Sequence, residues 1–525
     1  MTAQIRAPGS GVGSWPARRA LLTPERPAVR DGDRTLTYRQ LADRIAAVGA
    51  GLQHAGVTAG DRVAYLGGNS AALLSTMFAV LRIGGVFVPL NTRLAVAELA
   101  YMLEDSGARV LLAGPVKLDD ARAAAAKADA VQVVSSVPTP GLTDIDGLAG
   151  GAGTDADLPV LSEDETALIV YTSGTTGRPK GARLTHRNLT ANTLNQLTHL
   201  DVLSTDVTLA VAPLFHMGGL GLLVLPTLLK GGQVVIVEAF DPAGLLRLIE
   251  EAGATTFFGV PTMLAAMADH PDWSDARLDS LRLVLYGGSP VAEKVAAAWL
   301  ARGYPLVQGY GMTEASPGVL LAIPQGAPDH PTSPGMPHLF IDVGLRIDGT
   351  VHWPPPPEAT GELVVRGPNV FAGYWDRPTE TAAAFDRDGW FGTGDVARQA
   401  SDGWFTIVDR VKDMIISGGE NVYPAEVEAV LGGHPLVAEC AVVGVPDERW
   451  GEVGLAFVLP LPGTDIETDE LTRYLRDRLA RYKVPRHIRI VDQLPRNAMG
   501  KLVRPDLRRT AVELLEASAT DQPHL

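Results

Sequence analysis

The sequence is poor in cysteine, in positive charge and in long uninterrupted apolar runs. Cys440 is the single cysteine among 525 residues, so a disulfide framework within the chain is excluded and a reducing, cytoplasmic location is expected. Its surroundings, 439–443, are typical of a buried strand, which makes Cys440 a poor candidate for a catalytic nucleophile. The formal net charge of −15 disfavours nucleic acid as a partner, because binding phosphates along a strand requires a basic face.

No segment has the pattern of a secretory signal or of a membrane span. The stretch from Met1 to Pro16 lacks an apolar h-region, so no secretory signal is expected. The most apolar long window, 71–90, contains Arg82 and a pair of glycines at 84–85. It therefore predicts a buried helix followed by a strand at 86–90. Hydrophobic and charged fractions of 46% and 20% are those of a globular protein, and the length requires at least two domains.

The apolar periodicity predicts an α/β architecture. Helical spacing occurs at 38–53 and 71–82, and again after Thr185, whereas short apolar runs predict strands at 62–66, 86–90 and 110–112. Helices and strands that alternate in this way pack as layers. The segment 113–160 is rich in Ala, Asp, Gly and Pro, and we expect a helix and a linker there.

The most informative stretch is Tyr171-Thr172-Ser173-Gly174-Thr175-Thr176-Gly177-Arg178-Pro179-Lys180-Gly181, directly after an apolar strand at 167–170. Glycines let backbone N–H groups approach a phosphate, and the hydroxyls and the two cations add further donors and positive charge. The stretch predicts a loop that grips a polyphosphate. It is not a Walker A loop, because Lys180 follows a proline and is not followed by Ser or Thr.

A second pattern predicts where a nucleotide base would lie. A strand at 283–286, a helix at 290–300 and a strand at 305–308 form a βαβ unit. The loops 287–289 and 309–311 would then leave the carboxyl ends of neighbouring parallel strands, where open α/β sheets bind ligands. Gly287 and Gly288 would let an adenine lie against the backbone, and Tyr310 offers a stacking face.

Three further positions carry chemistry. Thr313 and Glu314 place a hydroxyl and a carboxylate just past that turn, and Mg²⁺ in ATP sites is held by few carboxylates together with phosphate oxygens. His216 ends an apolar run that we expect to be a strand, and two glycines follow soon after it. Asp395 follows a Gly-Thr-Gly turn.

Together these stretches resemble the adenylate-forming superfamily of acyl-CoA synthetases, peptide-synthetase adenylation domains and beetle luciferase. The resemblance extends in order through 171–181, 308–314, 392–395, 409–413 and 500–501. It implies an α/β fold with a large N-terminal domain of layered sheets at 1–410 and a hinge at 411–412. A small mobile α+β C-terminal domain would follow at 413–525, with 517–525 disordered.

The resemblance also implies roles for individual residues. ATP or AMP would be bound by Thr172, Ser173, Gly174, Thr175, Thr176, Lys180, Gly287, Gly288, Ser289, Gly309, Tyr310, Gly311, Met312, Thr313, Asp395 and Arg410. The metal would be held by Glu314 and Thr176, and the catalytic set would be Lys501, Thr313, Glu314 and His216. Lys412 would be the hinge, and Gly418 and Gly419 would shape the tunnel for coenzyme A.

The segment 495–501 resembles the motif that carries the catalytic lysine, with one departure. The family usually has Thr and Ser or Thr near two positions that are Asn497 and Met499 here. Because Gly500 and Lys501 are kept, we expect Lys501 to neutralise charge that develops between the carboxylate and the α-phosphate. Domain rotation about Lys412 would then withdraw Lys501 for the thiol step.

The expected reaction is ATP-dependent, AMP-forming ligation of a carboxylic acid to coenzyme A, with Mg²⁺. The expected acyl pocket is apolar and carries no acid to hold an ammonium group: His216, Met217, Gly218, Gly219, Val260, Pro261, Met263, Gly287, Gly288 and Pro317. The chain is most similar to fatty-acyl-CoA and hydroxycinnamoyl (feruloyl)-CoA synthetases, and the sequence leaves both acids open. A carrier-protein phosphopantetheine as acceptor, a non-catalytic nucleotide-binding scaffold and a homodimer are left open as well.

Overall fold

The computed structural model describes residues 10–128, 131–150, 158–172, 178–288, 291–330, 333–410, 413–417, 420–447, 450–479, 481–497 and 502–520. The chain divides into two units. The first comprises Met1–Val343 and Val365–Phe391, and the second comprises Gly344–Val364 and Gly392–Leu525.

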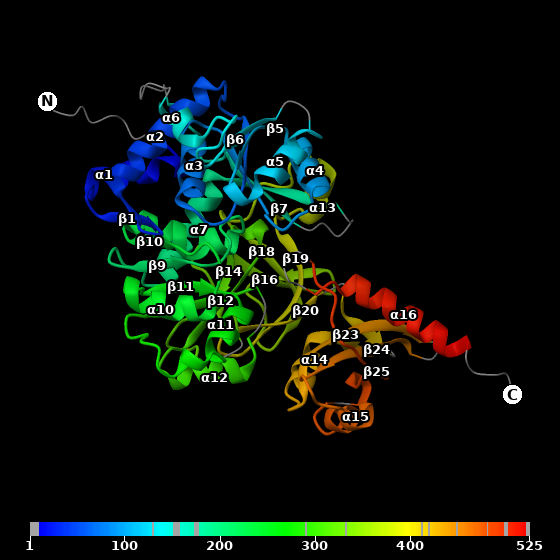
Figure 1. The fold of residues 1–525 in the computed structure, drawn as a ribbon. Coiled ribbons are helices and arrows are strands. Elements are labelled where there is room, and N and C mark those ends of the chain that lie inside the picture. Colours follow the sequence, from blue (N-terminus) through cyan, green and yellow to red (C-terminus); the bar gives the residue numbers. More distant parts are fainter. Residues whose placement is uncertain are drawn as a thin grey trace. The chain divides into compact units, whose positions relative to one another are not determined.

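A six-stranded, mostly parallel sheet forms one layer of the first unit (Figure 1). Its order is β6-β5-β3-β4-β7-β8, and only β7 and β8 pair in antiparallel fashion. The strands are β3 (Arg62–Leu66), β4 (Val86–Leu90), β5 (Ala108–Ala113), β6 (Gln132–Ser135), β7 (Thr166–Thr172) and β8 (Lys180–Thr185). Strand β4 is buried throughout, as expected where helices cover both faces of a parallel sheet.

The helices of this region confirm the periodicity. They are α2 (Tyr38–His54), α3 (Ala71–Arg82), α4 (Val96–Ser106), α5 (Leu118–Ala125) and α6 (Ile145–Gly150). Helix α2 buries Leu41, Ile45, Val48 and Leu52, the four residues at helical spacing. The segment 113–160 differs from the prediction, since it contains strand β6 in addition to helices.

The second layer of this unit is a nine-stranded sheet in the order β15-β14-β13-β12-β11-β9-β10-β1-β2. Its strands are β1 (Pro27–Asp31), β2 (Arg34–Thr37), β9 (Val207–Ala210), β10 (Gln233–Ile236), β11 (Thr256–Gly259), β12 (Leu283–Gly287), β13 (Leu306–Gly311), β14 (Gly318–Leu321) and β15 (Met336–Pro337). The predicted βαβ unit is confirmed, because β12 and β13 pair in parallel.

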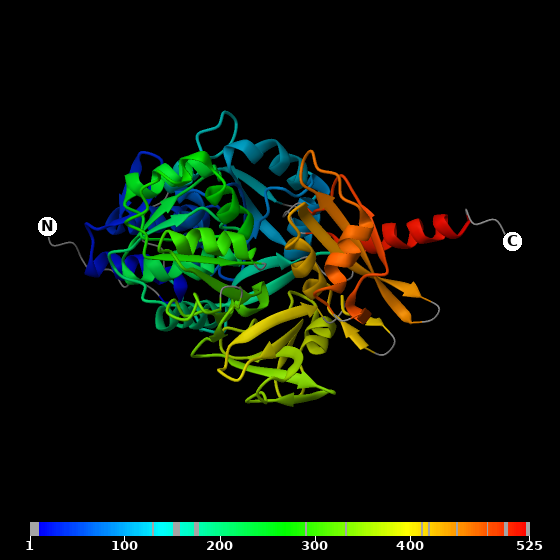
Figure 2. The same ribbon diagram turned by 90° about the horizontal axis from the view of Figure 1, so that it is seen from below.

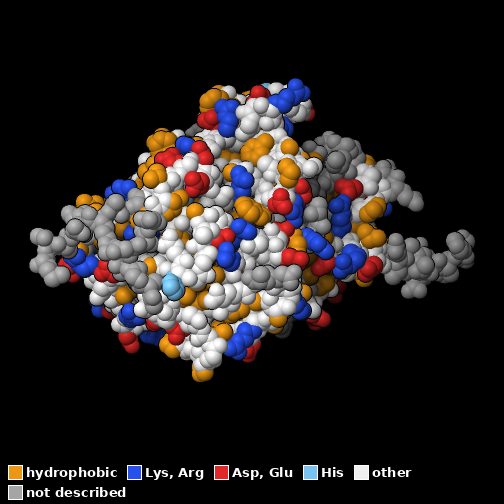
Figure 3. All heavy atoms as spheres, turned by 90° about the horizontal axis from the view of Figure 1, so that it is seen from above, with side chains coloured by type: hydrophobic (Ala, Val, Ile, Leu, Met, Phe, Trp, Pro, Cys, Tyr) orange, Lys and Arg blue, Asp and Glu red, His pale blue; other side chains and the backbone are white. Residues whose placement is uncertain are grey.

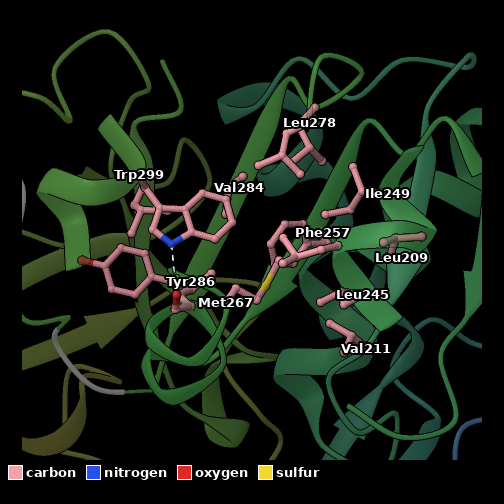
Figure 4. Packing of buried hydrophobic residues seen from close by; sticks show 14 of the residues in the cluster. Leu209, Val211, Leu245, Ile249, Phe257, Met267, Leu278, Val284, Tyr286 and Trp299 are labelled. Atoms are coloured by element: carbon pink, nitrogen blue, oxygen red, sulfur yellow. Dashed lines mark hydrogen bonds between the residues drawn. The ribbon is translucent and has the colours of Figure 1, made fainter. Parts of the chain in front are cut away.

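An apolar core covers one face of this sheet (Figure 4). Phe257, Tyr286 and Trp299 are fully buried there, and the Trp299 indole donates to the carbonyl oxygen of Leu264 at 3.1 Å. The aromatic and aliphatic side chains come from strands β9, β11 and β12 and from helices α10 (Pro242–Ala252), α11 (Pro261–Ala268) and α12 (Glu293–Ala301). This packing holds the carboxyl ends of the parallel strands in fixed register.

The remaining elements of the first unit are short or connect the layers. They are α1 (Trp15–Leu22), α7 (His186–His199), α8 (Met217–Gly219), α9 (Leu225–Lys230), α13 (Pro378–Ala384), the 3-10 turns Val12–Ser14, Pro115–Lys117, Pro271–Trp273 and Thr313–Ala315, and the π-turn Leu220–Val224. Helix α7 begins as predicted, with Thr185 as its N-cap in a capping box with Asn188.

The second unit contains two further sheets, seen in yellow and orange in Figure 2. One has the order β17-β16-β18-β19-β20 and runs in part into the first unit: β16 (Asp342–Ile347), β17 (Thr350–His352), β18 (Thr360–Arg366), β19 (Phe391–Gln399) and β20 (Phe405–Arg410). The other joins β21 (Ile415–Ser417), β22 (Glu420–Val422), β23 (Val437–Asp447), β24 (Gly451–Pro460) and β25 (His487–Ile490).

Three helices and one turn complete the second unit: α14 (Pro424–Gly432), α15 (Thr468–Arg476), α16 (Arg504–Thr520) and the 3-10 turn Arg481–Lys483. Leu471, Tyr474 and Leu475 predict a helix at 468–481, and α15 ends earlier, at Arg476. Helix α16 continues to Thr520 and so extends into the tail that the sequence predicts to be disordered. Cys440 lies in β23 as expected, and burial, with Glu428 nearby, raises the pKa of its thiol to about 12.

Charges of both signs are interspersed on the face shown in Figure 3, with apolar side chains scattered among them. Among the described residues, no helix is both long and apolar enough to cross a membrane.

Candidate active site

The ends of the predicted phosphate loop are fixed by strand pairing. Thr172 ends β7, Lys180 begins β8, and these two residues are register partners in the antiparallel pair. Lys180 therefore begins a strand and not a helix, which agrees with a loop that is not a Walker A loop. Ser173, Gly174, Thr175 and Thr176 lie outside the described residues, as do Ser289, Lys412, Gly418, Gly419 and Lys501.

A buried network that the sequence analysis missed supports this hairpin. The Tyr171 hydroxyl donates to Asp105 Oδ2 at 2.8 Å, and Asp105 also accepts from the guanidinium of Arg377 at 2.5 Å. Burial, together with the Asp105 carboxylate, raises the pKa of Tyr171, so its hydroxyl stays a donor. The Tyr101 hydroxyl donates to the carbonyl oxygen of Pro179 at 3.3 Å. The loop is thus anchored on α4 through its flanking residues.

Lys180 and Glu314 meet at one tyrosine. The Lys180 ammonium lies 5.5 Å from the ring centroid of Tyr374, whose hydroxyl donates to Glu314 Oε1 at 3.1 Å. Burial, with the Glu314 carboxylate beside it, raises the pKa of Tyr374, which keeps the hydroxyl protonated. The predicted phosphate lysine and the predicted metal carboxylate are therefore brought together, through a residue that the motifs did not single out.

The carboxyl ends of two neighbouring parallel strands, β12 and β13, lie at the predicted nucleotide side. Gly287 and Gly309 are register partners on β12 and β13, and a Cβ on Gly287 would lie 2.7 Å from the carbonyl oxygen of Gly309. Gly288 has φ +89°, a conformation that favours glycine. Tyr310 is half-buried at the end of β13, at the same edge of the sheet as Gly287 and Gly309.

The turn that carries Thr313 and Glu314 is closed on itself. Met312 N donates to the carbonyl oxygen of Pro317 at 3.0 Å, and a Cβ on Gly311 would clash with that oxygen. Phe371 N donates to the carbonyl oxygen of Glu314 at 2.7 Å. The carboxylate therefore projects from a fixed backbone, next to the β8 end of the phosphate hairpin.

The acid side departs from the predicted secondary structure. Strand β9 ends at Ala210, so the prediction of a strand that ends in His216 is wrong, and His216 is instead the N-cap residue of α8. The cause is Asn69, whose amide donates to the carbonyl oxygens of Ala210 and Ala212 at 2.9 and 3.1 Å. The Ala210 carbonyl oxygen also accepts from Val237 N, but beyond it the Ala212 carbonyl oxygen and Leu214 N bond to the Asn69 side chain and not to a strand.

Helix α8 brings the predicted pocket residues together with an aromatic ring that the prediction lacked. A Cβ on Gly218 would lie 3.4 Å from the Phe258 ring, and one on Gly287 would lie 3.5 Å from the same ring. Phe258 therefore lies between the acid-side helix and the adenine-side strand. Val260 and Pro261 follow directly at the end of β11, as the pocket prediction requires.

Two of the predicted nucleotide-binding residues, Asp395 and Arg410, lie in the second unit. Asp395 on β19 is the register partner of Arg410 on β20, and Asp395 is 7% exposed. The Thr393 hydroxyl accepts from Asp395 N at 3.1 Å and donates to the carbonyl oxygen of Leu363 at 2.6 Å. The two predicted residues are thus adjacent on neighbouring strands.

Comparison with known proteins identifies the family. A model of the AMP-binding enzyme matches residues 17–375, and a model of the AMP-binding enzyme C-terminal domain matches residues 426–501. The chain belongs to the AMP-binding enzyme family.

Individual members of the family match over nearly the whole chain. A feruloyl-CoA synthase of Amycolatopsis sp is 51% identical over 499 residues, 95% of this chain and 99% of the relative. An indoleacetate–CoA ligase of Aromatoleum aromaticum is 40% identical, covering 94% of this chain and 97% of the relative.

Among solved structures, o-succinylbenzoate CoA synthetase from Bacillus subtilis in complex with its acyl-adenylate intermediate matches with a TM-score of 0.84 at 33% identity. The match covers 94% of this chain and 97% of that chain. The same enzyme is also known in complex with ATP and magnesium ion.

These matches confirm the predicted superfamily and the adenylate-forming enzyme fold, with a large N-terminal and a small C-terminal domain. They also confirm the reaction class, an AMP-forming acyl-CoA synthetase that uses ATP, Mg²⁺ and coenzyme A. The described residues fit a magnesium ion, because Glu314 presents a carboxylate, a ligand type that Mg²⁺ prefers, close to the predicted phosphate lysine Lys180, and the Tyr374 hydroxyl that lies near both donates to it at 3.1 Å.

Proposed function

We propose that this protein is a hydroxycinnamate–CoA ligase that acts on ferulate and related acids. The observation that carries the proposal is the 51% identity to a feruloyl-CoA synthase, sustained over 95% of this chain. The sequence leaves fatty acids and hydroxycinnamates open, and the likeness to relatives named for ferulate and indoleacetate favours a planar aromatic acid.

The acid side supports this substrate. The segments that flank the proposed pocket are apolar, with glycines at Gly218 and Gly287 facing the Phe258 ring. A flat aromatic acid fits beside an aromatic ring and glycine backbone, since offset stacking needs only a few ångströms of depth. His216, at the start of α8, is proposed to orient the carboxylate at the mouth of the pocket.

The proposed reaction proceeds in two steps. In the first, a carboxylate oxygen of the acid attacks the α-phosphorus of ATP, and the bond to pyrophosphate breaks. Lys180 and the hydroxyls of the phosphate loop hold the departing pyrophosphate, Thr313 contacts the α-phosphate and Lys501 neutralises the charge between the reactants. Glu314, with Thr176, would hold a magnesium ion, which would supply positive charge to the phosphate oxygens.

In the second step the thiol of coenzyme A attacks the acyl carbon, its proton is lost to solvent and AMP departs. We propose that the C-terminal domain beyond the hinge at 411–412 rotates between the steps, so that Gly418 and Gly419 replace Lys501 at the site. Asp395 and Arg410 hold the ribose, while Gly309, Gly311 and Met312 border the nucleotide.

The test also distinguishes one other acceptor and one non-catalytic role. A carrier-protein phosphopantetheine could replace coenzyme A, and a scaffold could bind ATP without turnover.

The acidic net charge supports the absence of a nucleic-acid partner, and the dependence on ATP and coenzyme A supports a cytoplasmic location. A homodimer is likewise proposed and is tested by sedimentation.

The test is AMP formation by the purified protein with ATP and Mg²⁺, with and without coenzyme A. The acids would be ferulate, 4-coumarate, benzoate, decanoate, palmitate and malonate. Coenzyme A-dependent AMP release with ferulate and 4-coumarate supports the proposal, whereas release with decanoate or palmitate alone refutes it. Pyrophosphate release without a thioester indicates another acceptor, and ATP binding with no turnover on any acid indicates a scaffold.

A further inference from the structure

Helix α7 turns a row of amide side chains toward the protein interior. Asn188, Asn192, Asn195 and Gln196 are each at most 5% exposed. Their spacing of three and four residues places them on one face of the helix. Burying amides is costly unless they are hydrogen-bonded, so the partners of each amide bear on its role. Asn195 Nδ2 and Gln196 Oε1 have no hydrogen-bond partner among the described residues, whereas both polar atoms of the Asn192 side chain are bonded.

Asn192 spans two segments of the active site. Its Nδ2 donates to the carbonyl oxygen of Gly221 at 2.9 Å, and its Oδ1 accepts from Gly318 N at 3.0 Å. Gly221 lies in the helical segment that continues from the acid-side residues Met217–Gly219. Gly318 directly follows the turn that carries Thr313 and Glu314. One side chain of 1% exposure therefore joins the acid side to the nucleotide side.

The Gly221 carbonyl needs this partner because the helix is irregular there. In a regular α-helix Leu225 N would donate to Gly221, four residues earlier. Here Leu225 N donates to Leu220, which makes the turn a π-turn. The next residue, Pro226, has no N–H to offer. The Asn192 amide supplies the hydrogen bond that the helix itself does not.

The nucleotide-side turn is held in the same way. Asn369, which is fully buried, donates through Nδ2 to the carbonyl oxygens of Ala315 and Gly318 at 2.9 and 2.7 Å. A Cβ on Gly221 would lie 2.8 Å from Cδ of Pro317. The π-turn and the Thr313–Gly318 turn are therefore in contact, and Asn192 fixes their register through hydrogen bonds to both.

We propose that Asn192 is a positioning residue for adenylation, which sets the distance between the bound acid and the magnesium-bound nucleotide without contacting either. The inference rests on the proposed function insofar as the π-turn borders the acid and Glu314 holds the metal. Attack on phosphorus requires reacting atoms within a narrow distance, and a displacement of about 1 Å can cost about 100-fold in rate. The binding of ATP alone, or of the acid alone, does not depend on the relative position of the two turns.

The test compares Asn192→Leu with Asn195→Leu. Asn195 is an equally buried amide on the same helix, but its Oδ1 accepts from Phe340 N at 2.8 Å and its hydrogen bonds avoid both turns. The measurements are ATP–pyrophosphate exchange with the acid that the wild type adenylates, thermal stability, and calorimetric binding of MgATP and of a non-reactive acyl-sulfamoyl adenosine. The analogue occupies the acid side and the nucleotide side at once, so its affinity reports the relative position of the two sides without turnover.

Asn192→Leu is expected to lower the exchange rate and the affinity for the analogue by about 100-fold, with MgATP affinity unchanged. Asn195→Leu is expected to lower thermal stability and leave both values near those of the wild type. The proposal is overturned if the two variants behave alike, or if MgATP affinity falls by the same factor as the analogue.

A second variant covers the case in which leucine prevents folding. Asn192→Asp keeps the acceptor for Gly318 N and loses the donor to Gly221, so about a 10-fold weaker analogue is expected at unchanged MgATP affinity. An unchanged analogue affinity in that variant refutes the proposal. If ferulate is not adenylated by the wild type, the proposed substrate fails, and the comparison is made with the acid that is accepted.

Discussion

At the residue scale, Tyr374 makes the sharpest prediction, because it touches Glu314 and faces Lys180. Tyr374→Phe removes one hydroxyl and keeps the ring. The Glu314 carboxylate then loses a donor that orients it, and loss of such an outer contact typically weakens metal affinity about 10-fold. We expect a rise of that size in the Mg²⁺ concentration for half-maximal AMP formation, measured at saturating ATP and acid.

The matched control for Tyr374→Phe is Tyr65→Phe. Tyr65 is 2% exposed and its hydroxyl bonds to Ser70 at 3.0 Å, so the variant also deletes a hydroxyl from the interior. Its Mg²⁺ dependence should match that of the wild type. A shift of equal size in both variants would show that the Tyr374 hydroxyl acts through stability and not through the metal.

The sequence marks candidate chemical residues but not the residues that support them. Lys180, Glu314 and Asp395 stand out because phosphate and metal chemistry needs cations, acids and glycine-rich turns at short range. Tyr374 and Asn69 act from segments far away in the chain, through contacts that only the folded sheet creates. No local pattern marks such residues, since an isolated Tyr or Asn is common in any surface or core.

At the element scale, helix α7 faces the core with a different side from the one that its leucines predict. Leu189 is 1% exposed, as helical periodicity requires, but Leu194 is 42% exposed while its neighbour Asn195 is fully buried. The polar face is buried because it supplies hydrogen bonds to backbone groups of several segments. Periodicity detects the helix, but it cannot show that the amide side chains are buried while Leu194 is exposed.

This orientation predicts unequal costs for two leucine truncations on one helix. Leu189→Ala leaves a cavity in the interior and should lower the free energy of unfolding by about 3 kcal/mol. Leu194→Ala removes a partly solvated side chain and should cost less than about 1 kcal/mol. Urea denaturation of both variants measures the difference. Equal costs would mean that α7 presents its leucines to the core, contrary to the structure.

At the scale of the whole molecule, two buried histidines, His186 and His338, and the half-buried His199 predict acid sensitivity. Burial, with His199 beside it, lowers the pKa of His338 to about 3, and burial lowers the pKa of His186 to about 4 and that of His199. His186 Nδ1 accepts from Val12 N at 3.2 Å, which only the neutral ring can do. The folded protein therefore resists protonation that the unfolded chain accepts.

The sign follows from linkage. Between the ordinary histidine pKa of about 6.5 and the folded value, the unfolded state binds the additional proton, so stability is present above pH 6.5 and is lost as the pH falls. For His338 the loss between pH 7 and pH 5 is about 2 kcal/mol. We expect His338→Gln to flatten the fall in unfolding free energy over this interval by that amount, in urea titrations at both pH values. The same change of unfolding free energy with pH in the variant and the wild type would contradict this prediction.

The order of the motifs along the chain was predictable, because each motif is a local stretch of sequence. The division of the chain into two units was not, because it depends on which strands pair. The strands at 344–364 group with the C-terminal residues, a long-range pairing that no periodicity reveals. Within the second unit, Arg504 donates to Glu428 and to the carbonyl oxygen of Val442, both at 2.8 Å, and forms an ion pair with Asp413 at 3.8 Å. The start of α16, just after Lys501, is thereby fixed to the C-terminal sheet.

The proposed role of Lys501 in only one of the two steps predicts a separation of the half-reactions. Lys501→Ala should lower acyl-adenylate formation by about 100-fold or more, because the charge that develops between carboxylate and α-phosphate loses its cation. Thioester formation from supplied acyl-AMP and coenzyme A should be largely spared. Lys483→Ala is the control, since Lys483 pairs with Glu426 at 2.6 Å in the same unit and should affect neither step. If Lys501→Ala slows both half-reactions equally, Lys501 is not the adenylation residue and the proposed alternation about the hinge loses its basis.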